Sequence, residues 1–92
     1  MVLAGAKNTM IVTKDANLQG FAENFKNACF GAAGQRCMAA ANVLVEEAVY
    51  EQVKEIMLDV AKHVAVGDAC DESVYMGPVI SRQSVERIHK YI

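Results

Sequence analysis

Apolar residues gather in two short runs that are typical of buried β-strands. The first run, from Thr9 to Thr13, is apolar and β-branched and has polar residues on both sides. The second, from Asn42 to Val45, is also short, and the alanines 39–41 before it are compatible with a further helical turn. A continuous apolar run of this length indicates a strand inside a parallel or mixed sheet.

The rest of the chain repeats its apolar residues every three or four positions, which is the spacing of one helical face. One such stretch runs from Leu18 to Ala32, and Asn17 before it is a predicted N-cap. A second begins near Glu46 and extends to Val64, and a third is predicted to follow Ser81 as its cap. Strands that alternate with helices predict an α/β fold in which helices cover the sheet.

Composition restricts the class of protein. The chain has 92 residues, is 53% hydrophobic and 22% charged, and has a net charge of -2, which together indicate one small globular unit. No basic cluster suggests binding to nucleic acid, and no apolar run is long enough to span a membrane. The three irregularly spaced cysteines do not resemble a disulfide framework. We therefore expect reduced thiols and a cytoplasmic location, or the mitochondrial matrix in a eukaryote.

The three cysteines differ in their expected reactivity. Cys37 follows a Gly-Gln-Arg turn, and the neighbouring Arg36 would favour a thiolate or an anionic substrate. The alternative at this position is a helix that ends at glycine, followed by a small buried cysteine. Cys29 falls on an apolar helical stripe and is expected to be buried and inert, whereas Cys70 lies among acidic residues that disfavour a thiolate.

A metal site is not supported by the spacing of potential ligands. No pair of cysteines shows the two-to-four-residue spacing of structural zinc sites, so no residue is assigned to a metal. His63 and His89 are expected on outward-facing helix positions. No residue of the chain is a clear general base for Cys37, which leaves a papain-like pair unsupported.

Four motifs in order along the chain resemble the aldehyde dehydrogenase superfamily. The run from Phe30 to Ala39 matches its catalytic-cysteine signature, and Gly5–Asn8 with Asp15–Asn17 matches the block ahead of it. Val66–Asp68 and Met76–Ser81 match later landmarks. Within the superfamily the chain most resembles the CoA-acylating methylmalonate-semialdehyde dehydrogenase branch. The resemblance implies a Rossmann-like parallel sheet covered by helices.

The resemblance also implies a mechanism. Cys37 would attack the aldehyde carbon, hydride would leave to NAD, and the resulting thioester on Cys37 would pass to CoA. The backbone N–H of Cys37 and an asparagine outside this chain would hold the oxyanion. Arg36 would bind a substrate carboxylate, as the arginine before the cysteine does in this branch. No residue of the chain is assigned to NAD.

One departure from the family pattern bears on the second half-reaction. Hydrolytic members carry a glutamate base two residues before the glycine pair, and Leu3 occupies that place here. Leucine does not activate water, so the departure favours CoA, itself a thiol nucleophile, as the acyl acceptor.

Residues 1–92 are expected to be one piece of a catalytic domain. The chain opens in an apolar run and stops at Tyr91–Ile92 inside a helical pattern. The NAD-binding and oligomerisation segments are expected elsewhere in a larger, homo-oligomeric enzyme. The piece alone is expected to bind NAD poorly and to be inactive.

Three alternatives remain open from the sequence. The chain could belong to a hydrolytic aldehyde dehydrogenase. It could be a non-catalytic remnant that only packs against a partner. It could also be a thiol-based metal or redox module.

Overall fold

The computed structural model describes residues 6–92, and its two strands form a parallel sheet. Strand β1 (Asn8–Val12) pairs with β2 (Ala40–Val45) in a regular register from Thr9–Asn42 to Val12–Val45. The register shifts between Asn8 and Thr9, because Asn8 pairs with Ala40 and leaves one extra residue in β2. Such a bulge redirects the chain at the end of a ladder. Both predicted strands are confirmed.

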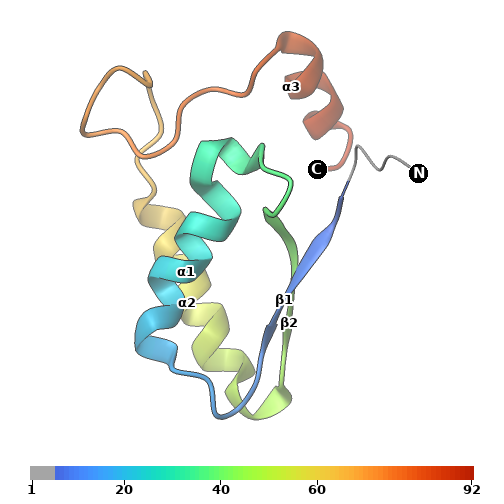
Figure 1. Ribbon diagram of the computed structural model, residues 1–92, viewed down its shortest axis with the longest axis vertical. Helices are drawn as coiled ribbons and strands as arrows, with labels where there is room; N and C mark the ends of the chain where they lie inside the picture. Colours follow the sequence, from blue (N-terminus) through green and yellow to red (C-terminus); the bar gives the residue numbers. More distant parts are fainter. Residues whose placement is uncertain (1–5) are drawn as a thin grey trace.

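Helices α1 (Leu18–Phe30) and α2 (Tyr50–His63) lie on the same side of the sheet (Figure 1). Their apolar stripes meet the inner face of the strands, as the three-to-four spacing predicts. The rings of Phe21 and Phe25 stack with their centroids 5.8 Å apart. The buried core is small and consists of Val12, Phe21, Phe25, Val49 and Val53.

Among residues 6–92, no helix covers the opposite face of the sheet. Ile11 and Leu44 pair across the ladder, and 71% and 60% of their surfaces are exposed. The radius of gyration is 14.5 Å, whereas a compact domain of this length has about 12 Å. The α/β prediction is confirmed, but the helices of residues 6–92 cover the sheet on one face.

The predicted helix caps are correct. The Asn17 side chain accepts the Gln19 N–H at the start of α1. The Ser81 side chain accepts the Ser84 N–H at the start of α3 (Arg82–His89). None of the helices in residues 6–92 has both the length and the apolar character needed to cross a membrane.

The structure defines two element boundaries more closely than the sequence does. Ala40 and Ala41 belong to β2 and not to a helical turn, because Ala40 pairs with Asn8 of β1 and Ala41 is the extra residue of the bulge. The helix predicted from Glu46 starts as a short 3₁₀ turn, η2 (Glu47–Val49), before α2. The Glu46 carboxylate accepts the Lys14 N–H at 2.7 Å and so joins two loops instead of capping a helix.

The segment between α2 and α3 crosses the carboxyl end of α1 (Figure 1). An isolated bridge joins Val66 to Met76 within it. The hydroxyl of Tyr75 donates a hydrogen bond to the Asn27 side chain, and the Lys26 Nζ lies 4.1 Å from the centre of the Tyr75 ring. These contacts hold the segment against α1.

Candidate functional site

The chain leaves α1 through an unusual turn, η1 (Gly31–Gly34). Ala32 and Ala33 each have a φ of 53°, and Gly34 has a φ of 71°. Glycine adopts this left-handed conformation readily, whereas an alanine there costs about 1–2 kcal/mol. Backbone strain of this kind collects at functional sites. Ala32 was predicted on the helical stripe, and the structure places it in this turn instead.

Cys37 lies in the next turn, just before β2, and its side chain is exposed. The Ala39 N–H donates to the Arg36 carbonyl at 3.1 Å and closes this turn. The Asn8 side-chain amide donates to the carbonyls of Cys37 at 2.7 Å and Ala39 at 3.1 Å. Among residues 6–92, no acceptor binds the Cys37 N–H. The thiol is therefore presented and not buried, which removes the alternative of a helix stop with a buried cysteine.

Gln35 joins the cysteine turn to the segment before α3. Its side-chain amide donates to the Ala32 carbonyl at 3.0 Å, and its oxygen accepts the Ile80 N–H at 2.9 Å. One hydrogen bond within the turn and one from Ile80, which lies 45 positions after Gln35 in the chain, thus hold the turn before Cys37 in place.

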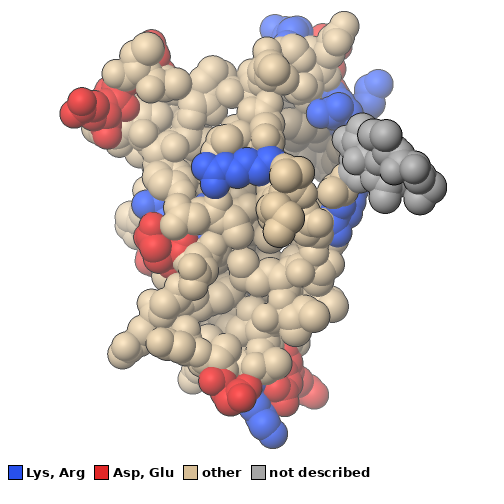
Figure 2. Space-filling model, in the orientation of Figure 1, with Lys and Arg blue, Asp and Glu red and all other residues tan. Residues whose placement is uncertain are grey.

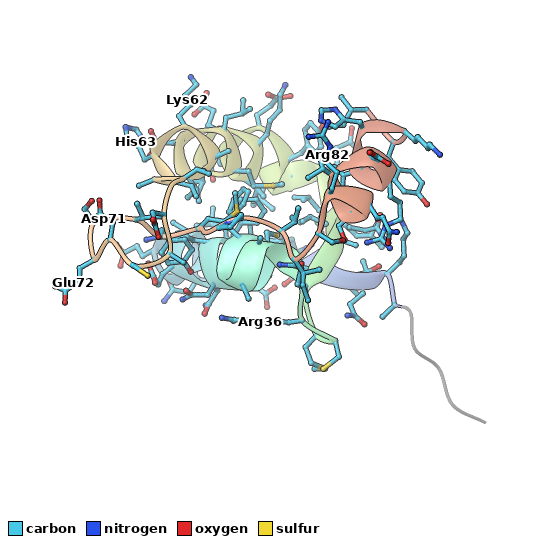
Figure 3. The ribbon with its side chains drawn as sticks, turned by 90° about the horizontal axis from the view of Figure 1, so that it is seen from above. Arg36, Lys62, His63, Asp71, Glu72 and Arg82 are labelled. Carbon is cyan, nitrogen blue, oxygen red and sulfur yellow. The ribbon has the colours of Figure 1, made fainter. Side chains whose placement is uncertain are left out.

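Arg36 extends from this turn along the side of α1 (Figure 3). It borders a shallow cavity of about 270 Å³, lined by Asn24, Asn27, Ala28, Arg36, Met38 and Ala39. None of the ion pairs between described residues involves Arg36. In Figure 2 the acidic side chains of the near face lie toward its margins, away from the centre. A guanidinium without a carboxylate partner can receive an anionic ligand.

The other two cysteines have different surroundings. Cys29 is half-buried on α1, and burial raises the pKa of its thiol above the ordinary value of 9.0. Cys70 is exposed in a polar loop, where its N–H donates to the Asp68 carboxylate at 2.9 Å. Only Cys37 adjoins an arginine.

The histidines are surface residues. His63 is exposed at the end of α2, with its Nδ1 3.3 Å from the Asp59 carboxylate. His89 is exposed at the end of α3. Within residues 6–92, no three His, Cys, Asp or Glu side chains lie close enough together to hold a metal ion.

Two residues of this site were not predicted. The sequence signal for Asn8 was its place in the Gly5–Asn8 motif, but its contact with a turn 29 residues away depends on strand register. The sequence signal for Gln35 is its place in the cysteine signature, which does not indicate its contact with Ile80. Leu3, on which the choice of acyl acceptor depends, lies outside the described residues.

Comparison with known sequences places this geometry in a family. The model of the aldehyde dehydrogenase family matches residues 1–92. Malonate-semialdehyde dehydrogenase 2 of Oceanobacillus iheyensis is 47% identical over 90 residues, which are 98% of this chain and 18% of that protein. Malonate-semialdehyde dehydrogenase of Bacillus pumilus is 44% identical over the same coverage. The chain therefore spans about a fifth of the length of these relatives.

Solved structures agree with the sequences. Betaine aldehyde dehydrogenase of Staphylococcus aureus, in complex with NAD+, has a TM-score of 0.90 at 30% identity over 95% of this chain and 17% of that one. A Sinorhizobium meliloti protein described as a methylmalonate-semialdehyde dehydrogenase, complexed with NAD, has a TM-score of 0.86 at 34% identity over 94% of this chain and 18% of that one. By its family match, its relatives and its fold, the chain belongs to the aldehyde dehydrogenase family.

Proposed function

We propose that this chain is the catalytic-cysteine segment of an NAD-dependent, CoA-acylating aldehyde dehydrogenase that acts on a carboxylated aldehyde such as malonate or methylmalonate semialdehyde. Cys37 is the nucleophile, and Arg36 binds the carboxylate of the substrate. The observation that carries the proposal is the presentation of an exposed thiol in a turn fixed by Asn8, next to an arginine without a carboxylate partner.

The first step is addition of the Cys37 thiolate to the aldehyde carbon. A carbon–sulfur bond forms, the carbonyl π electrons move to oxygen, and the product is a thiohemiacetal with a developing oxyanion. The Cys37 N–H has no acceptor among residues 6–92 and is free to donate to that oxygen. One such donor typically contributes on the order of 3 kcal/mol to the transition state.

The second step turns the thiohemiacetal into a thioester on Cys37. NAD, when bound in the complete enzyme, accepts the hydride. The loops after β1 (13–17) and after β2 (46–49) contain no glycine, so the described residues do not resemble a dinucleotide phosphate loop. We therefore assign the binding of NAD to parts of a longer enzyme and derive no contact with it from this chain.

Arg36 supports a carboxylated substrate. Its planar guanidinium suits bidentate binding of a carboxylate, and the cavity beside it adds the amide side chain of Asn24. The relatives from Oceanobacillus and Bacillus are named for malonate semialdehyde, which is an aldehyde with a carboxylate. This agreement favours a carboxylated over a neutral aldehyde.

CoA as the acyl acceptor rests on the resemblance and on Leu3. Leucine stands where hydrolytic members carry their glutamate base, and a thiol acceptor needs less activation than water. The alternative is a hydrolytic enzyme that releases the free acid.

A chimera tests the chemistry. This chain replaces its 90-residue counterpart in the Oceanobacillus enzyme, and NADH and the acyl product are measured with and without CoA. We expect NADH formation that is abolished by Cys37→Ala, with acyl-CoA as the product. A free acid formed at the same rate without CoA would contradict the proposed acceptor, and an active Cys37→Ala chimera would contradict the nucleophile.

Thiol labelling of the chain itself tests the alternative of a non-catalytic packing module. We expect Cys37 to alkylate faster than Cys29 and Cys70. Equal rates for all three thiols would favour the packing module. The chain alone is expected to form no NADH from malonate semialdehyde, and NADH formation that Cys37→Ala abolishes would overturn this expectation.

A further inference from the structure

Gly31 lies directly beneath the guanidinium of Arg36. An ideal Cβ built on Gly31 would be 2.7 Å from Nη1, 2.8 Å from Cζ and 3.0 Å from Nη2 of Arg36. Real side chains essentially never approach a Cβ this closely. The guanidinium therefore occupies the volume that any other residue at position 31 would fill.

The three distances also define the orientation of the guanidinium. They differ by little, although a point at the edge of the plane would be clearly farther from Cζ than from the two nitrogens. The flat face of Arg36 therefore covers Gly31. Since the N–H donors of a guanidinium point outward in its plane, this stacking leaves its edges available for an anion.

The backbone of Gly31 does not itself require a glycine. Its φ is -56° and its ψ is 128°, a conformation open to every residue. Gly31 is buried, and no left-handed conformation accounts for its lack of a side chain. What the missing side chain provides is the position of Arg36 beside the cavity bordered by Asn24 and Asn27.

We propose that Gly31 determines the preference for anionic ligands, because its missing side chain leaves room for the Arg36 guanidinium next to Cys37. A side chain at position 31 would displace the guanidinium from this position and weaken the binding of a carboxylate-bearing ligand. The inference rests on the proposed role of Arg36 and adds a residue that acts through it, as a positioning residue.

Two alkylating reagents that differ in charge test this inference on the chain as it is. Iodoacetate carries a carboxylate, and iodoacetamide is its neutral counterpart. In both reactions the thiolate sulfur attacks the CH₂ carbon and iodide leaves. The ratio of the two rate constants at Cys37 reports anion preference, independently of thiolate fraction. Cys70, beside Asp68, supplies an internal reference in the same sample.

Three variants separate the possible outcomes. Arg36→Gln removes the charge and is expected to lower the iodoacetate-to-iodoacetamide ratio at Cys37 by about threefold, the factor of a typical exposed ion pair. Gly31→Ala retains Arg36 and is expected to lower the ratio toward the same value. Gly20→Ala is the matched control, because a Cβ there would lie 3.9 Å from the Asn24 side chain, an ordinary van der Waals contact.

A double variant shows whether Gly31 acts through Arg36. Gly31→Ala in the Arg36→Gln background is expected to leave the ratio where Arg36→Gln alone puts it. If Gly31→Ala keeps the parent ratio while Arg36→Gln lowers it, the inference on Gly31 is wrong and the role of Arg36 stands. If Arg36→Gln also keeps the parent ratio, the carboxylate proposal itself fails.

Circular dichroism checks that each variant is folded. Gly31→Ser repeats the test if Gly31→Ala loses the helical signal of the parent chain. If neither variant folds, Gly31 is required for packing and the inference is overturned.

Discussion

Replacing Asn8 by alanine removes the side chain that joins β1 to the cysteine turn. Its amide donates two hydrogen bonds, to the carbonyls of Cys37 at 2.7 Å and Ala39 at 3.1 Å. A hydrogen bond contributes about 0.5–1.5 kcal/mol net, and the exposed Cys37 carbonyl can bind water instead. The Ala39 bond is partly buried and retains more of its value. We expect Asn8→Ala to destabilise the turn by about 1–2 kcal/mol.

Hydrogen exchange measures this local loss. The Ala39 N–H donates to the Arg36 carbonyl and closes the cysteine turn, so its exchange reports opening of that turn. A loss of about 1.4 kcal/mol speeds exchange about tenfold. Asn8→Asp keeps the shape of the side chain but replaces its donors by a carboxylate facing two carbonyls. It is expected to speed exchange at least as much as Asn8→Ala.

The matched control is Asn42→Ala. Asn42 is an exposed asparagine of the same sheet, and its side chain makes no hydrogen bond within residues 6–92. Its replacement is expected to leave Ala39 exchange unchanged. Equal exchange rates of Ala39 in Asn8→Ala and Asn42→Ala would refute the role of Asn8 in holding the cysteine turn.

The remaining predictions concern stability and titration. Val53 is fully buried, so Val53→Ala is expected to lower the free energy of unfolding in urea by about 2 kcal/mol. Ile92→Ala, at a residue that is 98% exposed, is expected to leave that free energy unchanged. Ala33→Gly relieves a φ of 53° and is expected to raise the same free energy by about 0.5–1 kcal/mol; a loss of stability would contradict the left-handed turn. Burial raises the pKa of Cys29, so the pH midpoint of its alkylation is expected above 9.0 in the folded chain and near 9.0 in denaturant. Because the folded state holds this proton more tightly, the associated stability is present below pH 9 and is lost as the pH rises through the folded pKa.

Local patterns were sufficient to predict the strands, the helices and two caps. The spacing of apolar residues reflects which face of an element is buried, and the Asn17 and Ser81 side chains bond within their own first turns. The end of α1 was predicted wrongly because the apolar spacing continues through Ala32. Alanine favours helix, and nothing local signals its φ of 53°.

The sequence indicated the candidate residues Cys37 and Arg36, but not the contacts that surround them. Cys37 and Arg36 stood out by their neighbours in the sequence. Asn8 contacts Cys37 and Ala39, which lie 29 and 31 positions later in the chain. These contacts depend on the register of β1 against β2 and on the bulge between them. The apolar pattern of a strand does not specify which residue of the neighbouring strand it pairs with. A shift of the pairing by one residue would leave the sequence pattern of each strand unchanged but would move the Asn8 side chain away from the cysteine turn.

The cysteine turn is held by side chains from three separate parts of the chain. Asn8 reaches it from β1, the Ile80 N–H reaches Gln35 from the segment before α3, and Gly31 at the end of α1 accommodates Arg36. Only the contact between Gly31 and Arg36 joins residues that are close in the sequence. Because β1 is also one side of the small core, a mutation that weakens the pairing of β1 with β2 loosens the cysteine turn as well. The stability of the fold and the exposure of the Cys37 thiol are therefore coupled through Asn8. A substitution in the core is expected to change the conformation of the cysteine turn although the substituted residue does not contact Cys37.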